Sequence, residues 1–148
     1  MIASLTPGDV YKYYNQAGGV ATEDAYPLIN QPESGRRCIF NYSMDGIQIL
    51  GPAGYERVPT GDEEALKRAV RQRGPVTAMF TVAPDFFSYM DGVYTAPSTG
   101  CNPGTARTVS HALLIIGYGT ENGQDYWLVQ NSWGESWGIN GFAKIARG

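Results

Sequence analysis

The sequence lacks any long hydrophobic run, any block of basic residues and any low-complexity tract. No stretch of its 148 residues approaches the roughly 18 consecutive apolar residues of a membrane span. The N-terminus does not have the basic and then apolar layout of a signal peptide. A formal net charge of −3, without a cluster of Lys or Arg, gives no basis for binding a polyanion. Membranes and nucleic acids are therefore not expected partners.

Charged residues and cysteines are also scarce. Charged side chains make up 17% of the chain, against about 25% in typical domains. Hydrophobic residues reach 43% and aromatic residues 12%, and 19 Gly and 9 Pro supply turns. This composition argues against disorder and predicts a compact, β-rich protein of about one domain. From the residues alone, a bond between Cys38 and Cys101 remains open.

Two segments carry the start and stop signals of helices. Thr6 can cap a short helix that Gly18 ends. The clearer helix covers residues 62–73, where Thr60 or Asp62 can act as the N-cap. Acidic residues fill its first turn and basic residues its last, as the helix dipole favours.

Apolar runs bounded by turn residues predict strands in the second half of the chain. Residues 76–82, 112–116 and 126–129 have this pattern. Asn122-Gly123, between the last two runs, is the strongest short hairpin signal available. His111 and Asn131 thus end adjacent antiparallel strands, which can bring their side chains within hydrogen-bond reach.

This pairing of a histidine with an asparagine is typical of a particular nucleophilic chemistry. A cysteine nucleophile reacts as its thiolate, so it needs a base to take its proton and a third group to orient that base. His111 is the candidate base and Asn131 the candidate orienting amide, in a Cys-His-Asn arrangement.

Two tryptophans follow the asparagine closely. Trp133 is predicted to cover the hydrogen bond between His111 and Asn131, shielding it from water and so strengthening it. Trp137 is expected to pack nearby. The alternative is that His111 is an ordinary core residue and that residues 131–134 form a turn between strands.

The segment from His111 to Phe142 resembles papain-family cysteine proteases of the cathepsin L type nearly residue for residue. It contains His-Ala-Leu-Leu-Ile-Ile-Gly-Tyr-Gly and Asn-Ser-Trp-Gly-Glu-Ser-Trp-Gly. Upstream, Gly74-Pro75-Val76, Phe87-Ser88-Tyr89 and Gly92-Val93-Tyr94 look like the family's barrel strands. The resemblance implies an α+β, papain-like fold that is mostly the antiparallel β-barrel lobe. Residues 1–48 would be part of the helical lobe, and residues 49–148 the barrel lobe with the catalytic His and Asn.

The family's nucleophile segment, Cys-Gly-Ser-Cys-Trp, and the Gln before it do not occur in this sequence. Cys38 and Cys101 resemble structural half-cystines, whose family partners would fall outside residues 1–148. The resemblance therefore implies a fragment of a longer protease, and neither cysteine is assigned as the nucleophile. The isolated chain is expected to be inactive.

The activity implied for the complete protein is that of a cysteine-type endopeptidase acting by acyl transfer, without a metal or organic cofactor. Met79 and Ala112 look like walls of the pocket for the apolar residue before the scissile residue, although Met79 fits ordinary core packing equally well. Ser110 replaces the family's Asp or Asn, and its backbone is the expected substrate contact. The alternatives are a non-catalytic, peptide-binding papain-like protein and a free-standing lobe.

The resemblance also implies partners and a location. Peptide or protein substrates are expected, together with the missing N-terminal lobe, a pro-segment or cystatin-type inhibitors. A lysosomal or extracellular location is implied, and Asn41 heads a glycosylation triplet consistent with secretory passage.

Overall fold

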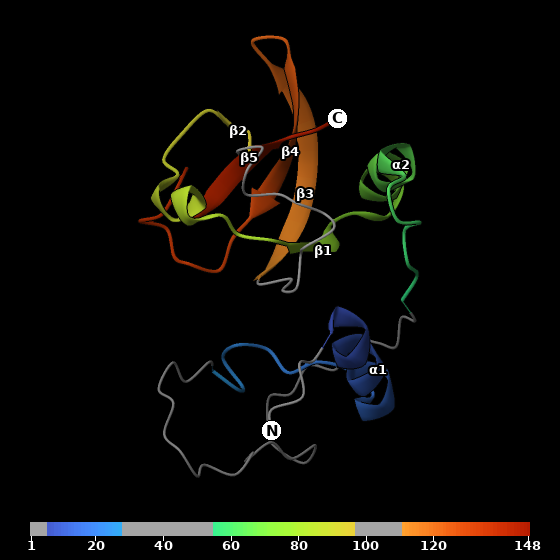
Figure 1. Ribbon diagram of the computed structural model, residues 1–148. Coiled ribbons are helices and arrows are strands. Elements are labelled where there is room, and N and C mark those ends of the chain that lie inside the picture. The colour runs from blue at the N-terminus through green and yellow to red at the C-terminus, as the bar shows by residue number, and fades with distance from the viewer. Residues whose placement is uncertain (1–5, 28–54, 97–110) are drawn as a thin grey trace. The chain divides into compact units, whose positions relative to one another are not determined.

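The computed structural model describes residues 6–27, 55–96 and 111–148, which hold two α-helices and a five-stranded mixed sheet (Figure 1). The chain divides into two compact units, residues 1–57 and residues 58–148. Of the described elements, the first unit contains α1 (Pro7–Ala17), and the second contains α2 (Glu63–Arg73) and the five strands. The fold class is α+β, as expected. The predicted lobe boundary between residues 48 and 49 lies outside the described residues.

Helix α1 is held at both ends by its own sequence. The Thr6 hydroxyl oxygen accepts from the Asp9 N–H at 3.4 Å, and the Asp9 carboxylate accepts from the Thr6 N–H at 3.0 Å, which makes a capping box. The Thr6 hydroxyl also donates to the Asp9 carboxylate at 2.7 Å, and this bond, followed by the one from the Thr6 N–H, lowers the pKa of Asp9. Gly18 ends the helix in the left-handed conformation, with φ of 79°. The predicted start and end are confirmed.

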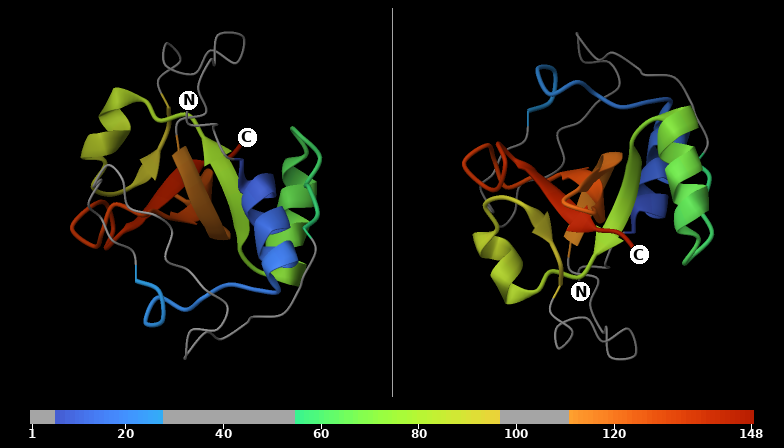
Figure 2. Two further views of the ribbon diagram at one scale, coloured as in Figure 1. Left: turned by 90° about the horizontal axis from the view of Figure 1, so that it is seen from below. Right: turned by 90° about the horizontal axis from the view of Figure 1, so that it is seen from above.

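Helix α2 begins after Asp62, whose side chain accepts from the Ala65 N–H at 2.8 Å. Of the two predicted caps, Asp62 is therefore the one used. The helix ends at Gly74, and Val70 is its buried residue. Helix α2 and the short 3₁₀ helix η1 (Pro84–Ser88) flank the strands on opposite sides in both views of Figure 2.

The sheet has the strand order β1-β3-β4-β5-β2. In chain order, its strands are β1 (Val76–Phe80), β2 (Val93–Tyr94), β3 (His111–Glu121), β4 (Gln124–Gln130) and β5 (Phe142–Ala146). Strands β3 and β4 form a hairpin whose turn residues, Asn122 and Gly123, have φ of 50° and 81°. Positive φ at both positions is what a tight hairpin turn requires, so the Asn-Gly signal is confirmed.

The sheet is not wholly antiparallel, and in this respect the expectation of an antiparallel barrel lobe is wrong. Strand β2 runs parallel to β5, with Val93 opposite Lys144. Tyr89 accounts for this placement, because its hydroxyl donates to the Gly92 carbonyl oxygen at 2.6 Å and accepts from the Lys144 N–H at 3.2 Å. One phenol thus ties the start of β2 to β5. Burial raises the pKa of Tyr89.

Several predicted bounds also change. Strand β1 ends at Phe80 instead of residue 82, and residues 84–88, which precede β2, form the helical turn η1 and not a strand. Strand β3 is longer than predicted and contains a register shift between Ile115 and Gly117. Bulges of this kind bend a strand, and an apolar run in the sequence does not reveal them.

The core of the second unit lies where alternate residues of the hairpin meet α2, β5 and η1. Its buried members are Val70, Phe86, Tyr89, Leu113, Ile115, Trp127, Val129 and Ala143. The i, i+2 spacing within β3 and β4 places these side chains on one face of each strand. The ends of both strands are thereby fixed relative to the core.

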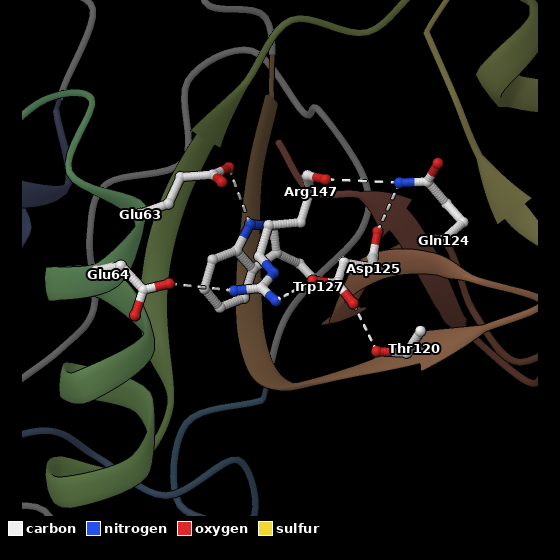
Figure 3. Close-up of polar contacts among 7 residues, drawn as sticks. All are labelled: Glu63, Glu64, Thr120, Gln124, Asp125, Trp127 and Arg147. Carbon is white, nitrogen blue, oxygen red and sulfur yellow. Dashed lines mark hydrogen bonds and ion pairs between the residues drawn. The ribbon is translucent and has the colours of Figure 1, made fainter.

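Arg147 links β5 to the hairpin and to α2 (Figure 3). Its guanidinium lies 2.5 Å from Asp125 Oδ2, 3.6 Å from Glu64 Oε1 and over the Trp127 ring, 5.4 Å from the centroid. Asp125 Oδ1 also accepts from the Thr120 hydroxyl at 2.5 Å. These contacts hold the far end of the hairpin, away from His111 and Asn131.

The Asp125 contacts predict a specific acid sensitivity. The Thr120 hydroxyl, and then the nearby Arg147, lower the pKa of Asp125 below its usual 3.8. Because the folded state holds the lower pKa, its stabilisation is present above the unfolded pKa and is lost as pH falls through the folded pKa. In urea titrations from pH 6 to pH 2, Asp125→Asn is expected to be less stable than the unmodified chain at pH 6, and this difference should shrink toward pH 2. Thr120→Val should show the same trend more weakly, whereas a pH-independent difference would contradict the assignment.

Candidate active site

His111 and Asn131 lie at the same edge of the sheet because β3 and β4 are antiparallel. His111 opens β3, and Asn131 follows the last residue of β4. The Asn131 N–H donates to the Gly141 carbonyl oxygen at 2.9 Å, which fixes the backbone beyond the strand. Across the sheet, Phe80 of β1 pairs with His111. Both side chains are therefore carried by rigid elements and not by free loops.

The two side chains are in direct hydrogen-bond contact, with His111 Nε2 at 2.7 Å from Asn131 Oδ1. The predicted proximity is confirmed. The Ser132 N–H donates to the same oxygen at 2.8 Å. A backbone N–H can only donate, so the Asn131 atom that it contacts must be the carbonyl oxygen. His111 Nε2 is therefore the donor and carries the proton.

This orientation of the amide determines what the imidazole can do. With the proton on Nε2, the neutral ring has its lone pair on Nδ1, where it can accept a proton from another group. Asn131 Nδ2 is buried and has no hydrogen-bond partner within the described part of the chain. The two bonds to Oδ1 are thus the interactions that hold the amide in this orientation.

Trp133 packs against the imidazole, with the two ring centroids 4.8 Å apart and the planes at 30°. Its indole also packs edge to face with Phe86 and Trp137, at centroid distances of 5.9 Å and 5.1 Å, and lies flat against Phe87 at 4.9 Å. The predicted positions of Trp133 beside His111, and of Trp137 nearby, are confirmed. An apolar wall of this kind limits the access of water to the hydrogen bond.

The loop that carries the two tryptophans returns tightly on itself. The Gly141 N–H donates to the Trp137 carbonyl oxygen at 2.8 Å. Gly138 has φ of 57°, and a Cβ added there would lie 2.5 Å from the Phe142 carbonyl oxygen. Glycine at position 138 is therefore required for the loop to close.

Met79 and Ala112 are direct cross-strand partners in β1 and β3. Both are exposed, Met79 to 46%. Directly opposite residues of an antiparallel pair project from the same face, so these two side chains are neighbours. Met79 is not part of the buried core. Ser110, Cys38, Cys101 and Asn41 lie outside the described residues.

Phe86 and Phe87 are contacts of Trp133 that the sequence interpretation did not assign to the site. The usable signal was Pro84-Asp85, since Pro at the first position of a helical turn favours a helix over a strand. A helical turn at this place aims consecutive aromatic side chains in different directions. Phe86 enters the core, fully buried, while Phe87 stays 60% exposed.

The described residues contain no group of three or more His, Cys, Asp or Glu side chains arranged to hold a metal ion. None of their helices is long and apolar enough to cross a membrane.

Comparison with known proteins agrees with this geometry. A sequence model of the family described as "Papain family cysteine protease" matches residues 5–148, nearly the whole chain. The chain belongs to the papain family of cysteine proteases. Among its relatives in this family, mouse cathepsin K is 40% identical over 138 residues, which cover 93% of this chain and 39% of that protein. Cathepsin L of Sarcophaga peregrina is 38% identical over 141 residues, covering 94% and 38%.

Solved structures of this papain family match as well. Digestive procathepsin L2 proteinase from the larval midgut of Tenebrio molitor aligns with a TM-score of 0.79 and 39% identity, covering 95% of this chain and 41% of that one. Procathepsin L3 from the same source aligns with a TM-score of 0.77 and 34% identity. The fold is therefore papain-like and the chain resembles cathepsins L and K. It spans about two fifths of the length of the relatives it matches.

The hydrogen bond between the two side chains can be measured without any assay of activity. His111 is the only histidine, so every imidazole signal in an NMR spectrum belongs to it. We expect ¹⁵N shifts of the neutral ring to place the proton on Nε2. Asn131→Ala should speed the exchange of this proton with water about fivefold, as loss of one hydrogen bond of about 1 kcal/mol implies. A ring protonated on Nδ1, or unchanged exchange in Asn131→Ala, would contradict the arrangement.

Proposed function

We propose that this chain is the His- and Asn-bearing part of a cysteine-type endopeptidase that cleaves peptide bonds by Cys-His-Asn acyl transfer. The observation that supports it most is the His111–Asn131 hydrogen bond of 2.7 Å, which leaves Nδ1 as the proton acceptor. The papain-like fold and the family membership make a cysteine the expected nucleophile. That cysteine would come from outside the 148 residues, since Cys38 and Cys101 are proposed as structural half-cystines.

The residues present account for the proton transfers of such a reaction. His111 Nδ1 takes the proton of the thiol, and the thiolate attacks the carbonyl carbon of the substrate. The imidazolium then donates this proton to the leaving amine as the C–N bond breaks, which leaves a thioester. Finally His111 Nδ1 takes a proton from water, which attacks the thioester carbonyl. As the C–S bond breaks, the imidazolium returns this proton to the leaving thiolate, which gives the free acid and the thiol. Asn131 keeps the ring oriented through Nε2–H in each of these steps.

The substrate is proposed to lie extended along the edge that Met79 and Ala112 border. Their exposure and their cross-strand pairing suit a shared apolar wall. This wall would hold the apolar residue that precedes the scissile residue. Ser110, directly before His111, would contact substrate through its backbone.

The remaining expectations follow from this assignment. Residues 1–48 would be part of the helical lobe and residues 49–148 the barrel lobe. Peptide or protein substrates, the rest of the catalytic domain, a pro-segment and cystatin-type inhibitors are the proposed partners. A lysosomal or secreted location is proposed because the relatives are cathepsins. No metal or organic cofactor enters the mechanism.

A second candidate is a papain-like protein that binds peptides without cutting them. The full set of His111, Asn131 and Trp133 speaks against it, because peptide binding alone needs no oriented base. Sequencing the coding region on both sides of residues 1–148 separates the two. A Cys at the nucleophile position, in a Gln…Cys-Gly-Ser-Cys-Trp setting, supports the protease, and Gly or Ala there supports the binding protein.

Substitution of the orienting amide tests the mechanism in the complete protein. Asn131→Ala should lower kcat/KM on a peptide substrate about 10- to 100-fold, the range expected for one hydrogen bond to a charged ring. Gln130→Ala is the matched control, since Gln130 is exposed and directly precedes Asn131 in the chain. Equal effects of both substitutions would contradict the proposal, as would thiol-dependent turnover by residues 1–148 alone.

Substitution of Met79 tests the proposed pocket wall. Met79→Ala removes three heavy atoms and should shift preference toward aromatic over branched side chains before the scissile bond. A change of about tenfold in the ratio of the two kcat/KM values is expected for a pocket that loses this much contact. Met90→Ala makes the same replacement at a residue that is 78% exposed, and it should leave the ratio unchanged. An unchanged ratio in Met79→Ala would remove Met79 from the pocket.

A further inference from the structure

Phe87 has an unusual position for a large apolar side chain. It is 60% exposed, yet its ring lies almost parallel to the indole of Trp133, with centroids 4.9 Å apart and an interplanar angle of 7°. An exposed aromatic ring gains little from burial, so its stacking on Trp133 is the specific contact that it makes.

The backbone of Phe87 is fixed independently of its ring. The Trp137 indole N–H donates to the Phe87 carbonyl oxygen at 3.0 Å, and the preceding residue, Phe86, is fully buried in the core. A substitution of the Phe87 side chain therefore leaves these anchors in place. What it removes is the flat contact with Trp133.

The contacts of Trp133 divide by geometry. Phe86 and Trp137 meet it edge to face, at 63° and 83°. Phe87 instead lies parallel to the indole, at 7°, and so supports its plane by a flat contact. That plane matters because the same indole packs on the imidazole of His111 at 4.8 Å.

We propose that Phe87 is a positioning residue, which holds the Trp133 indole against His111 and so keeps water from the His111–Asn131 hydrogen bond. Phe87 acts on this hydrogen bond through Trp133, on which both its own ring and the His111 imidazole pack. The inference rests on the proposed function for its catalytic meaning. The protection of the His111–Asn131 hydrogen bond by Trp133 does not depend on which nucleophile the complete protein has.

The test is the rate at which the His111 Nε2 proton exchanges with water, measured by NMR on the 148-residue chain. Phe87→Ala should raise this rate about two- to tenfold, the factor that corresponds to loss of one aromatic stacking contact. Phe87→Leu keeps apolar volume but not the flat ring, and should raise the rate as well. Phe87→Tyr keeps the ring, with its hydroxyl free to reach solvent, and should retain the rate of the unmodified chain.

Met90→Ala is the matched control, because Met90 is a neighbouring apolar residue that is 78% exposed. In Met90→Ala, the His111 Nε2 proton should exchange at the same rate as in the unmodified chain. The proposal is overturned if exchange is unchanged in both Phe87→Ala and Phe87→Leu, or if Met90→Ala raises it equally. Amide spectra of each variant verify that the fold is kept, and Phe87→Leu decides the matter if Phe87→Ala does not fold.

The exchange measurement can be interpreted whether or not the proposed protease function is correct. If the complete protein proves to be a peptide-binding protein, exchange of the Nε2 proton still reports whether Phe87 positions Trp133. If exchange is insensitive to Phe87, the acyl-transfer mechanism keeps its own support from the His111–Asn131 hydrogen bond.

Discussion

The antiparallel pairing of β3 with β4 is the constraint on which the rest of the site depends. It places the start of one strand beside the end of the next, so that His111 and Asn131 meet although twenty residues separate them. The pairing is itself held by alternate core residues and by a tight turn. Close packing adds a further requirement, since a Cβ at Gly119 would lie 2.6 Å from the Tyr126 hydroxyl oxygen. A change of register by one residue would turn His111 to the other face.

A chain of aromatic contacts connects the buried core to His111. Phe86 is completely buried and contacts Tyr89, Tyr94, Trp133 and Trp137. Trp133 in turn packs on His111. The imidazole is thus oriented by the hydrogen bond from its Nε2 to Asn131, whose amide is held by the Ser132 N–H, and by an apolar wall on its ring. Polar bonds determine which nitrogen carries the proton, and the wall excludes the solvent that would compete for it.

Local signals in the sequence explain what could be predicted. The Asp62 cap, the Gly18 terminus and the Asn-Gly turn each act over a few residues, and the hairpin then makes the His111–Asn131 contact predictable. Long-range contacts explain what could not. The parallel direction of β2 depends on the Tyr89 hydroxyl, which bridges Gly92 and Lys144. Likewise the stacking of Phe87 on Trp133 joins residues that no pattern in the sequence connects.

The hairpin also has a consequence for the order of folding. The paired residues of β3 and β4 are close in sequence, whereas Val93 of β2 pairs with Lys144 of β5, roughly fifty residues later. Closing a short loop costs less chain entropy than closing a long one, and contacts of low sequence separation form faster. We therefore expect the histidine and asparagine to meet early, while the chain is still only partly folded. The aromatic wall over them, which needs η1 and the loop after β4 together, is then a late addition to a pair that already exists.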